Sequence, residues 1–237
     1  MGWARAWADA PYPWGMADIR LDIKSELPKA IRWTDQMTKQ LPFAISQALN
    51  SVGFETRTGL KGSTRRYFDN PTRFIENAWL VKKSSKRDLV VTIYPEKRRA
   101  PYLKANIQGG RRGIKPMEVK LQSMQVGNLP RNQRLVPAVV KQNAQGNVTR
   151  ATIGRIIRNN QTAGRNSTFV GKPTGGARAA GVYQRMPGGA LRPLFIAVSS
   201  ATYRPRFPIN EIAQKVVSRR FGSYLRSSLE RAVATAR

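Results

Sequence analysis

Carboxylates are the side chains on which acid–base or metal chemistry in this chain would depend, because its 237 residues include no histidine and no cysteine. Those absences exclude a disulfide, a thiolate nucleophile, a Cys/His zinc site and a Ser-His-Asp triad. Two groups of carboxylates are close in sequence: Asp18, Asp22 and Glu26, then Asp69 and Glu76. Such groups could support glycosidic or metal-dependent phosphoryl chemistry. Because Lys and Arg lie beside them, we interpret them as charge partners and predict no enzyme, no catalytic or metal-binding residue and no cofactor.

Positive charge dominates the composition. Lys and Arg number 42 against 13 Asp and Glu, a formal net charge of +29. From Val119 to Asn210 there is no Asp or Glu at all. Three interpretations are open: contact with nucleic-acid phosphates, docking on an acidic protein, or a merely solvated surface. Charge of this density repels itself, which favours a negatively charged neighbour that offsets it.

The arginines in and near this acid-free region are the candidate contact residues. The first two lie in a glycine-rich basic turn, Gly109–Gly113, and the others follow along the chain. Aromatic side chains for base stacking are few, and no helix-turn-helix or zinc-finger pattern occurs, so recognition of a base sequence is not expected. We predict that six arginines contact DNA or an acidic partner: Arg111, Arg112, Arg150, Arg155, Arg158 and Arg165.

The N-terminal part has the pattern of a strand followed by a long helix. Ala17–Lys24 alternates apolar and charged residues, which is typical of a half-buried strand. From Leu27 to Val52, apolar residues recur every three or four positions, which predicts an amphipathic helix. Pro42 lies within this pattern, so we expect a kink or two abutting helices there.

Shorter elements follow. Phe54–Phe68 is predicted to be a further helical segment, interrupted by Gly59 and Gly62. Two β-rich runs, Trp79–Lys83 and Leu89–Tyr94, predict a hairpin.

The middle of the chain predicts short elements joined by long loops. Pro116–Met124 has the composition of a short helix, and Asn147 could cap a second helix that buries Ile153, Ile156 and Ile157. The strand candidates are Phe169-Val170, Val182–Arg185 and Leu194–Val198.

A long amphipathic helix is predicted from Pro208 to near the C-terminus. Its apolar stripe needs a covering surface, either the helix that begins at Leu27 or a neighbouring subunit. A basic helix of this kind could also lie on an anionic membrane, which we consider less favoured than a core or interface role. The residues assigned to the core or subunit interface are Ile209, Ile212, Val216, Phe221, Leu225 and Leu229.

The order of elements predicts an α+β fold, with long N- and C-terminal helices packed on a small antiparallel sheet and a basic, loop-rich insert. We expect a single domain over residues 16–237, with its basic loop-rich region at 125–207. Met1–Gly15 holds three of the five tryptophans. We expect this segment to be a flexible extension, with translation starting at Met1 or Met16, or alternatively an ordered arm that anchors to a partner.

Several short segments, taken in order, carry a resemblance to a known family. They are Leu41-Pro42-Phe43-Ala44 with Ala48-Leu49-Asn50, Tyr102-Leu103-Lys104 with Gly109-Gly110-Arg111-Arg112, Gly181–Arg185, Leu191–Phe195, and Tyr203 with Phe207-Pro208 before the basic C-terminal helix. From about Met16 to Arg237 the chain resembles the minor tail, or tail-completion, proteins of long-tailed bacteriophages and prophages, of the lambda protein Z kind. The motifs are short and non-catalytic, and only their ordered set is specific.

The resemblance implies a virion structural protein at the head-proximal end of the tail, present in the host cytoplasm during assembly. Such a protein completes the tail, joins it to the head and lets DNA pass. The implied partners are other tail and neck proteins (tube, terminator or connector), copies of itself in a ring, and double-stranded DNA contacted non-specifically, with no membrane. The resemblance leaves open whether the protein acts as a tail terminator, a neck adaptor or a separate completion factor. The alternative function is a sequence-independent nucleic-acid-binding protein.

Overall fold

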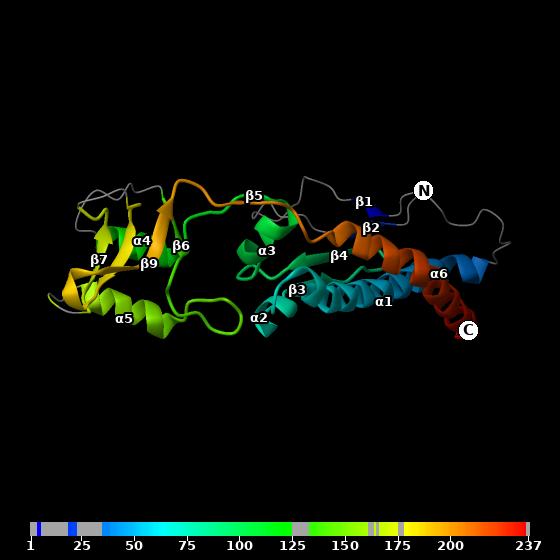
Figure 1. Ribbon diagram of the computed structural model, residues 1–237. Coiled ribbons are helices and arrows are strands. Elements are labelled where there is room, and N and C mark those ends of the chain that lie inside the picture. The colour runs from blue at the N-terminus through cyan, green and yellow to red at the C-terminus, as the bar shows by residue number, and fades with distance from the viewer. Residues whose placement is uncertain are drawn as a thin grey trace. The chain divides into compact units, whose positions relative to one another are not determined.

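Two compact units make up the protein, one of them inserted into the other. The computed structural model describes residues 4–5, 19–22, 35–124, 133–160, 164, 166–174 and 178–235. The first unit, here called the frame, comprises Met1–Gly109 and Arg204–Arg237, and the second, the insert, comprises Gly110–Tyr203 (Figure 1). The fold class is α+β, as predicted. The division into two units differs from the single domain expected over 16–237.

The frame is built on α1 (Asp35–Tyr67), a continuous helix of 33 residues. The helix continues through Pro42, Gly59 and Gly62, so the two abutting helices that were one expectation at Pro42 and the interruptions expected at the two glycines do not occur. Tertiary packing accounts for this, because burying one apolar face stabilises a helix more than a few poor helix formers weaken it. The residues of that face are Ala44, Ile45, Ala48, Leu49, Val52 and Leu60. The part of the predicted helix before Asp35 lies outside the described residues.

A four-stranded antiparallel sheet packs against α1. Its spatial order is β1-β2-β4-β3, with bounds β1 (Ala4–Arg5), β2 (Ile19–Asp22), β3 (Trp79–Lys82) and β4 (Val90–Pro95). The predicted hairpin is confirmed, since β3 and β4 pair in antiparallel register with Val81 opposite Ile93. β1 falls within the segment 1–15 that was expected to be flexible, and its two residues pair with β2.

The C-terminal helix α6 (Ile209–Ala234) lies alongside α1 (Figure 1). Ile209 is buried, Ile212, Val216, Phe221 and Leu225 pack against the same core, and Leu229 is half-buried. The apolar stripe of α6 is therefore covered, at least in part, by α1 of the same chain.

Aromatic contacts and two short helices complete the frame. The ring of Phe207 lies 5.5 Å from that of Tyr67, 5.4 Å from Phe68 and 6.1 Å from Trp79, measured between centroids. The short helices are α2 (Arg73–Glu76) and α3 (Ala100–Ile107).

The insert has a core of its own, around a second antiparallel sheet in the order β6-β9-β8-β7. A two-stranded ribbon, β5 with β10, joins its two ends and sets Gly110 opposite Tyr203. The bounds are β5 (Gly110–Arg111), α4 (Pro116–Ser123), β6 (Arg134–Pro137), α5 (Arg150–Asn160), β7 (Thr168–Gly171), β8 (Gly181–Arg185), a 3-10 turn (Pro187–Gly189), β9 (Leu191–Val198) and β10 (Thr202–Tyr203).

Most elements predicted for the insert are present, and one cap is wrong. The amide of Thr152 donates to Oγ1 of Thr149 at 3.2 Å, so Thr149, and not Asn147, caps α5. Where the structure describes the region 125–207, which was expected to be loop-rich, it contains five strands, α5 and the 3-10 turn. No helix in the described part of the chain is long and apolar enough to cross a membrane.

Two glycines on α1 test how closely it approaches the sheet. A Cβ at Gly53 would lie 2.7 Å from Cγ2 of Val91, whereas one at Gly62 would meet no heavy atom within 4 Å. Alanine favours a helix over glycine by about 1 kcal/mol, and overpacking a core costs about 1–3 kcal/mol. We therefore expect Gly53→Ala to destabilise the frame by about 1 kcal/mol and Gly62→Ala to stabilise it by a similar amount, measured by chemical denaturation. Stabilisation by both substitutions would contradict the close packing of α1 on β4.

Candidate polyanion-binding surface of the insert

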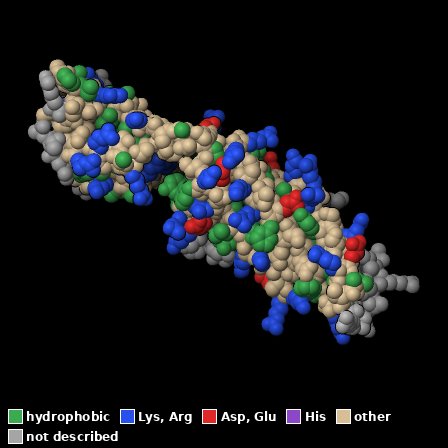
Figure 2. Space-filling view, turned by 90° about the horizontal axis from the view of Figure 1, so that it is seen from below, with side chains coloured by type: hydrophobic (Ala, Val, Ile, Leu, Met, Phe, Trp, Pro, Cys, Tyr) green, Lys and Arg blue, Asp and Glu red, His purple; other side chains and the backbone are tan. Residues whose placement is uncertain are grey.

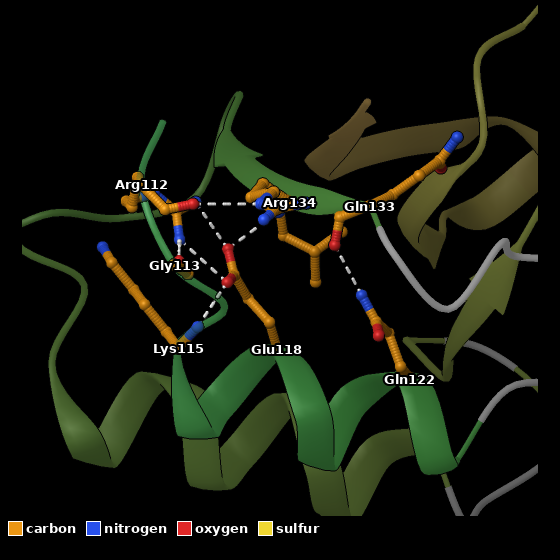
Figure 3. Close-up of polar contacts among 8 residues, drawn as sticks. Arg112, Gly113, Lys115, Glu118, Gln122, Gln133 and Arg134 are labelled. Carbon is orange, nitrogen blue, oxygen red and sulfur yellow. Dashed lines mark hydrogen bonds and ion pairs between the residues drawn. The ribbon is translucent and has the colours of Figure 1, made fainter. Parts of the chain in front are cut away.

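The insert contains a single carboxylate, Glu118, and its side chain is fully buried at 0 % exposure. Figure 3 shows the hydrogen bonds that surround it. Oε1 accepts from Nη2 of Arg112 at 2.6 Å and from the amide of Leu135 at 2.9 Å. Oε2 accepts from Nη1 of Arg112 at 2.8 Å and from the amide of Lys115 at 2.6 Å. Both oxygens are thus satisfied within the insert, by a bidentate arginine and two backbone amides.

These bonds determine the ionisation of Glu118. Burial alone raises the pKa of its carboxyl, but the hydrogen bonds from Arg112 and from the two amides outweigh burial and hold the pKa below its ordinary value of 4.5. The same ion pair raises the pKa of Arg112. Glu118 is therefore an anion at neutral pH whose charge Arg112 neutralises inside the protein.

The ion pair also connects three segments of the insert. Arg112 follows β5, Lys115 precedes α4, and Leu135 lies in β6. The carbonyl of Arg112 accepts from Nε of Arg134 at 3.1 Å, and the carbonyl of Gln133 accepts from Nε2 of Gln122 at 2.6 Å (Figure 3). The start of the insert is therefore fixed to its first helix and to its edge strand through one carboxylate.

The surface of the insert consequently carries positive side chains and no negative ones. Its residues include fifteen Lys and Arg and one Asp or Glu, and that one is buried. Figure 2 shows Lys and Arg side chains in blue over the face of the insert in view, with no red side chain among them. Such a surface attracts polyanions without selecting a base sequence.

The structure separates the six arginines that the sequence singled out. Arg150, Arg155 and Arg158 are exposed on α5, and Arg111 is exposed on β5. Arg112 is held by Glu118 and keeps only 13 % of its side chain exposed, so its main contact is internal. Arg165 lies outside the described residues.

A small pocket lies beside α5, at the end of the insert's sheet. It has a volume of about 170 Å³, and Lys141, Arg155 and Arg192 are the cations that line it. Lys141 and Arg192 were not among the contact residues predicted from the sequence. They come from a loop and from β9, far apart in the sequence, and no local pattern links them to α5.

The frame uses its carboxylates differently, in ion pairs between elements. Glu76 pairs with Arg65 at 2.6 Å, and Asp69 lies 3.7 Å from Arg206. These two were candidate catalytic carboxylates, and each has a separate arginine, in line with their interpretation as charge partners. Asp18 and Glu26 lie outside the described residues. No cluster of three or more acidic residues that could hold a metal occurs in the part of the chain that the structure describes.

A larger groove, of about 690 Å³, lies between α1 and α6 in the frame. Two carboxylates, Glu55 and Glu211, line it together with Arg and Lys side chains. Glu55 accepts a hydrogen bond from Tyr224 at 2.6 Å and one from Arg220 at 2.8 Å, which together lower its pKa. This mixed charge suits an anion less well than the insert does.

Comparisons of the chain with protein-family models, with curated proteins and with solved structures found no match.

Replacing Glu118 by Gln tests the internal ion pair. We expect Glu118→Gln to destabilise the insert by about 3 kcal/mol at pH 7, because it leaves Arg112 charged, largely buried and without its partner. The folded-state pKa of Glu118 is lowered, so its stabilisation is complete above its ordinary pKa of 4.5 and is lost as the pH falls through the folded pKa. The difference between wild type and variant should therefore shrink in acid.

Hydrogen exchange read by mass spectrometry can assign this loss to the insert peptides. The control is Glu76→Gln in the frame, whose partner Arg65 is 76 % exposed and should lose less. Equal losses in the two variants, or faster exchange confined to the frame, would contradict the assigned role of Glu118.

Proposed function

We propose that this chain is a structural component of the tail of a long-tailed bacteriophage, located at the head-proximal end, where its insert faces the DNA that passes. The observation that carries the proposal is the surface of the insert, which has cations and no surface carboxylate because its one carboxylate is buried and paired with Arg112. The resemblance of the sequence to tail-completion proteins indicates the assembly in which the chain acts. The positive charge of the insert indicates that its neighbour in that assembly is negatively charged.

Like charges on a small unit repel, and the repulsion is relieved when a polyanion displaces the mobile counterions. Phosphates meet this requirement at every nucleotide, so the contact is independent of base sequence and tolerates DNA that moves past. An acidic tail or connector protein could offset the same charge, but only where its own surface matches.

The frame suits a place in an assembly. In the described residues, carboxylates of the frame join elements of the chain, for example α1 to α6 through Glu55 and Arg220 and α1 to α2 through Arg65 and Glu76. The groove between these helices and the exposed Val233 near the end of α6, at 46 %, are surfaces that a neighbouring subunit could cover. We propose a homo-oligomeric ring at the tail end as the arrangement.

The second candidate function is a sequence-independent nucleic-acid-binding protein that acts as a free chain. The same cationic surface favours it, because phosphate contact needs no assembly. The two candidates differ in where the protein is found, and this difference gives the first test.

Purified particles provide that test. We expect the chain in virions at a fixed number of copies, with density at the head-proximal end of the tail by electron microscopy. Particles produced without the gene should be defective in head–tail joining. Complete, infectious particles without the chain would reject the proposal, and absence from virions combined with tight DNA binding would support the second candidate.

Salt dependence tests the nature of the contact. If about six cations of the insert contact phosphates, the affinity for a short DNA duplex should fall by about 10³-fold between 50 and 200 mM salt. Duplexes of different base sequence should bind equally. Affinity that changes little with salt, or that depends on base sequence, would contradict phosphate contact by the insert.

A further inference from the structure

We propose that the pocket beside α5 binds one phosphate group. Three cations line it: Lys141 from the loop after β6, Arg155 from α5 and Arg192 from β9. Where the phosphate belongs to DNA, this inference rests on the proposed function. It adds the place on the insert where a backbone phosphate is held.

No carboxylate of the insert can neutralise these three cations. The only one in the unit is Glu118, and both of its oxygens are occupied by Arg112 and by two backbone amides. Cations from three separate elements therefore face one small space without an internal counter-ion. Bringing like charges together is unfavourable unless an anion lies between them, and a phosphate oxygen is an acceptor that Arg and Lys both prefer.

The walls of the pocket supply further polar groups. Thr168, Gln184 and Arg192 lie opposite one another across β7, β8 and β9, so their side chains form one row on the sheet. The hydroxyl of Thr168 donates to the carbonyl of Ile156 at 2.7 Å, which fixes α5 against that row. Nη2 of Arg192 donates to the carbonyl of Val139 at 3.4 Å, which links Arg192 to the loop that carries Lys141.

The pocket has room for a phosphate group. Its volume of about 170 Å³ is well above the space that a single ordered water requires. Lys141, Arg155 and Arg192 are exposed, so a phosphate that remains part of a chain can enter from outside. The groove in the frame is larger but includes two carboxylates, which would repel the same ligand.

Two triple variants of the full chain distinguish the contribution of the pocket to DNA binding from the contribution of positive charge in general. The pocket triple is Lys141→Gln, Arg155→Gln and Arg192→Gln. The matched control is Arg150→Gln, Lys172→Gln and Arg178→Gln, which removes the same charges from exposed positions of the insert outside the pocket. We expect the pocket triple to weaken binding to a 20-base-pair duplex at least tenfold more than the control at equal salt. Circular dichroism checks folding, and Lys141→Gln alone replaces the triple if the triple does not fold.

A second measurement uses the unaltered protein and inorganic phosphate. In an NMR titration, the amide signals of Thr152, Gln184 and Arg192 should shift and saturate with phosphate at millimolar concentration, while chloride at equal ionic strength leaves them unchanged. This readout does not depend on any variant and does not require DNA to be the source of the phosphate.

The outcomes distinguish the two proposals. Saturable phosphate binding with a selective loss of DNA binding in the pocket triple supports a site for a backbone phosphate. Saturable phosphate binding with equal losses in both triples, or with no DNA binding at all, supports the pocket but assigns it to a free phosphate source. No saturable shift together with equal losses overturns the pocket and leaves the proposed contact between insert and DNA intact.

Discussion

The excess of positive charge on the insert is the constraint on which the other features depend. A unit with fifteen cations and one carboxylate cannot hold itself together by surface ion pairs, so an apolar core and hydrogen bonds must do so. Its single carboxylate is used inside, where it joins β5, α4 and β6 through four hydrogen bonds. The other cations have no second carboxylate in their own unit, and an external anion is the neighbour that relieves their repulsion.

The frame handles the same kind of residue in a different way. Two of its acidic side chains lie between elements, where Glu55 joins α1 to α6 and Glu76 joins α1 to α2. The arginine of each pair is largely exposed, so each pair contributes little stability, but the pairs give the frame a surface of mixed sign. The insert therefore presents cations without surface carboxylates, whereas the frame combines both signs and contains the packing between the two long helices. This division is consistent with one unit that builds an assembly and one that faces its negatively charged contents.

Periodicity in the sequence was enough to predict the hairpin of β3 and β4, the C-terminal helix and the three strands β7 to β9, because each depends on local spacing. The division into units was not predictable in this way, since it depends on the pairing of Gly110 with Tyr203 across the whole insert. Arg112 was assigned to an external partner because its basic neighbours dominate the local pattern, whereas its carboxylate lies six residues away on a helix. The pocket cations were missed for the same reason, because only the folded sheet brings Arg192 to Arg155.

The ribbon of β5 and β10 has a consequence for how the protein is made. The insert is continuous in sequence and can fold as soon as it leaves the ribosome, whereas the frame must wait for α6, which is synthesised last. Once the ribbon has formed, the folded insert counts as a short connection, because its first and last residues are neighbours. The entropy cost of bringing α6 back to α1 is then that of closing the frame residues between them, 68–109 and 204–208, without the further 94 residues of the insert.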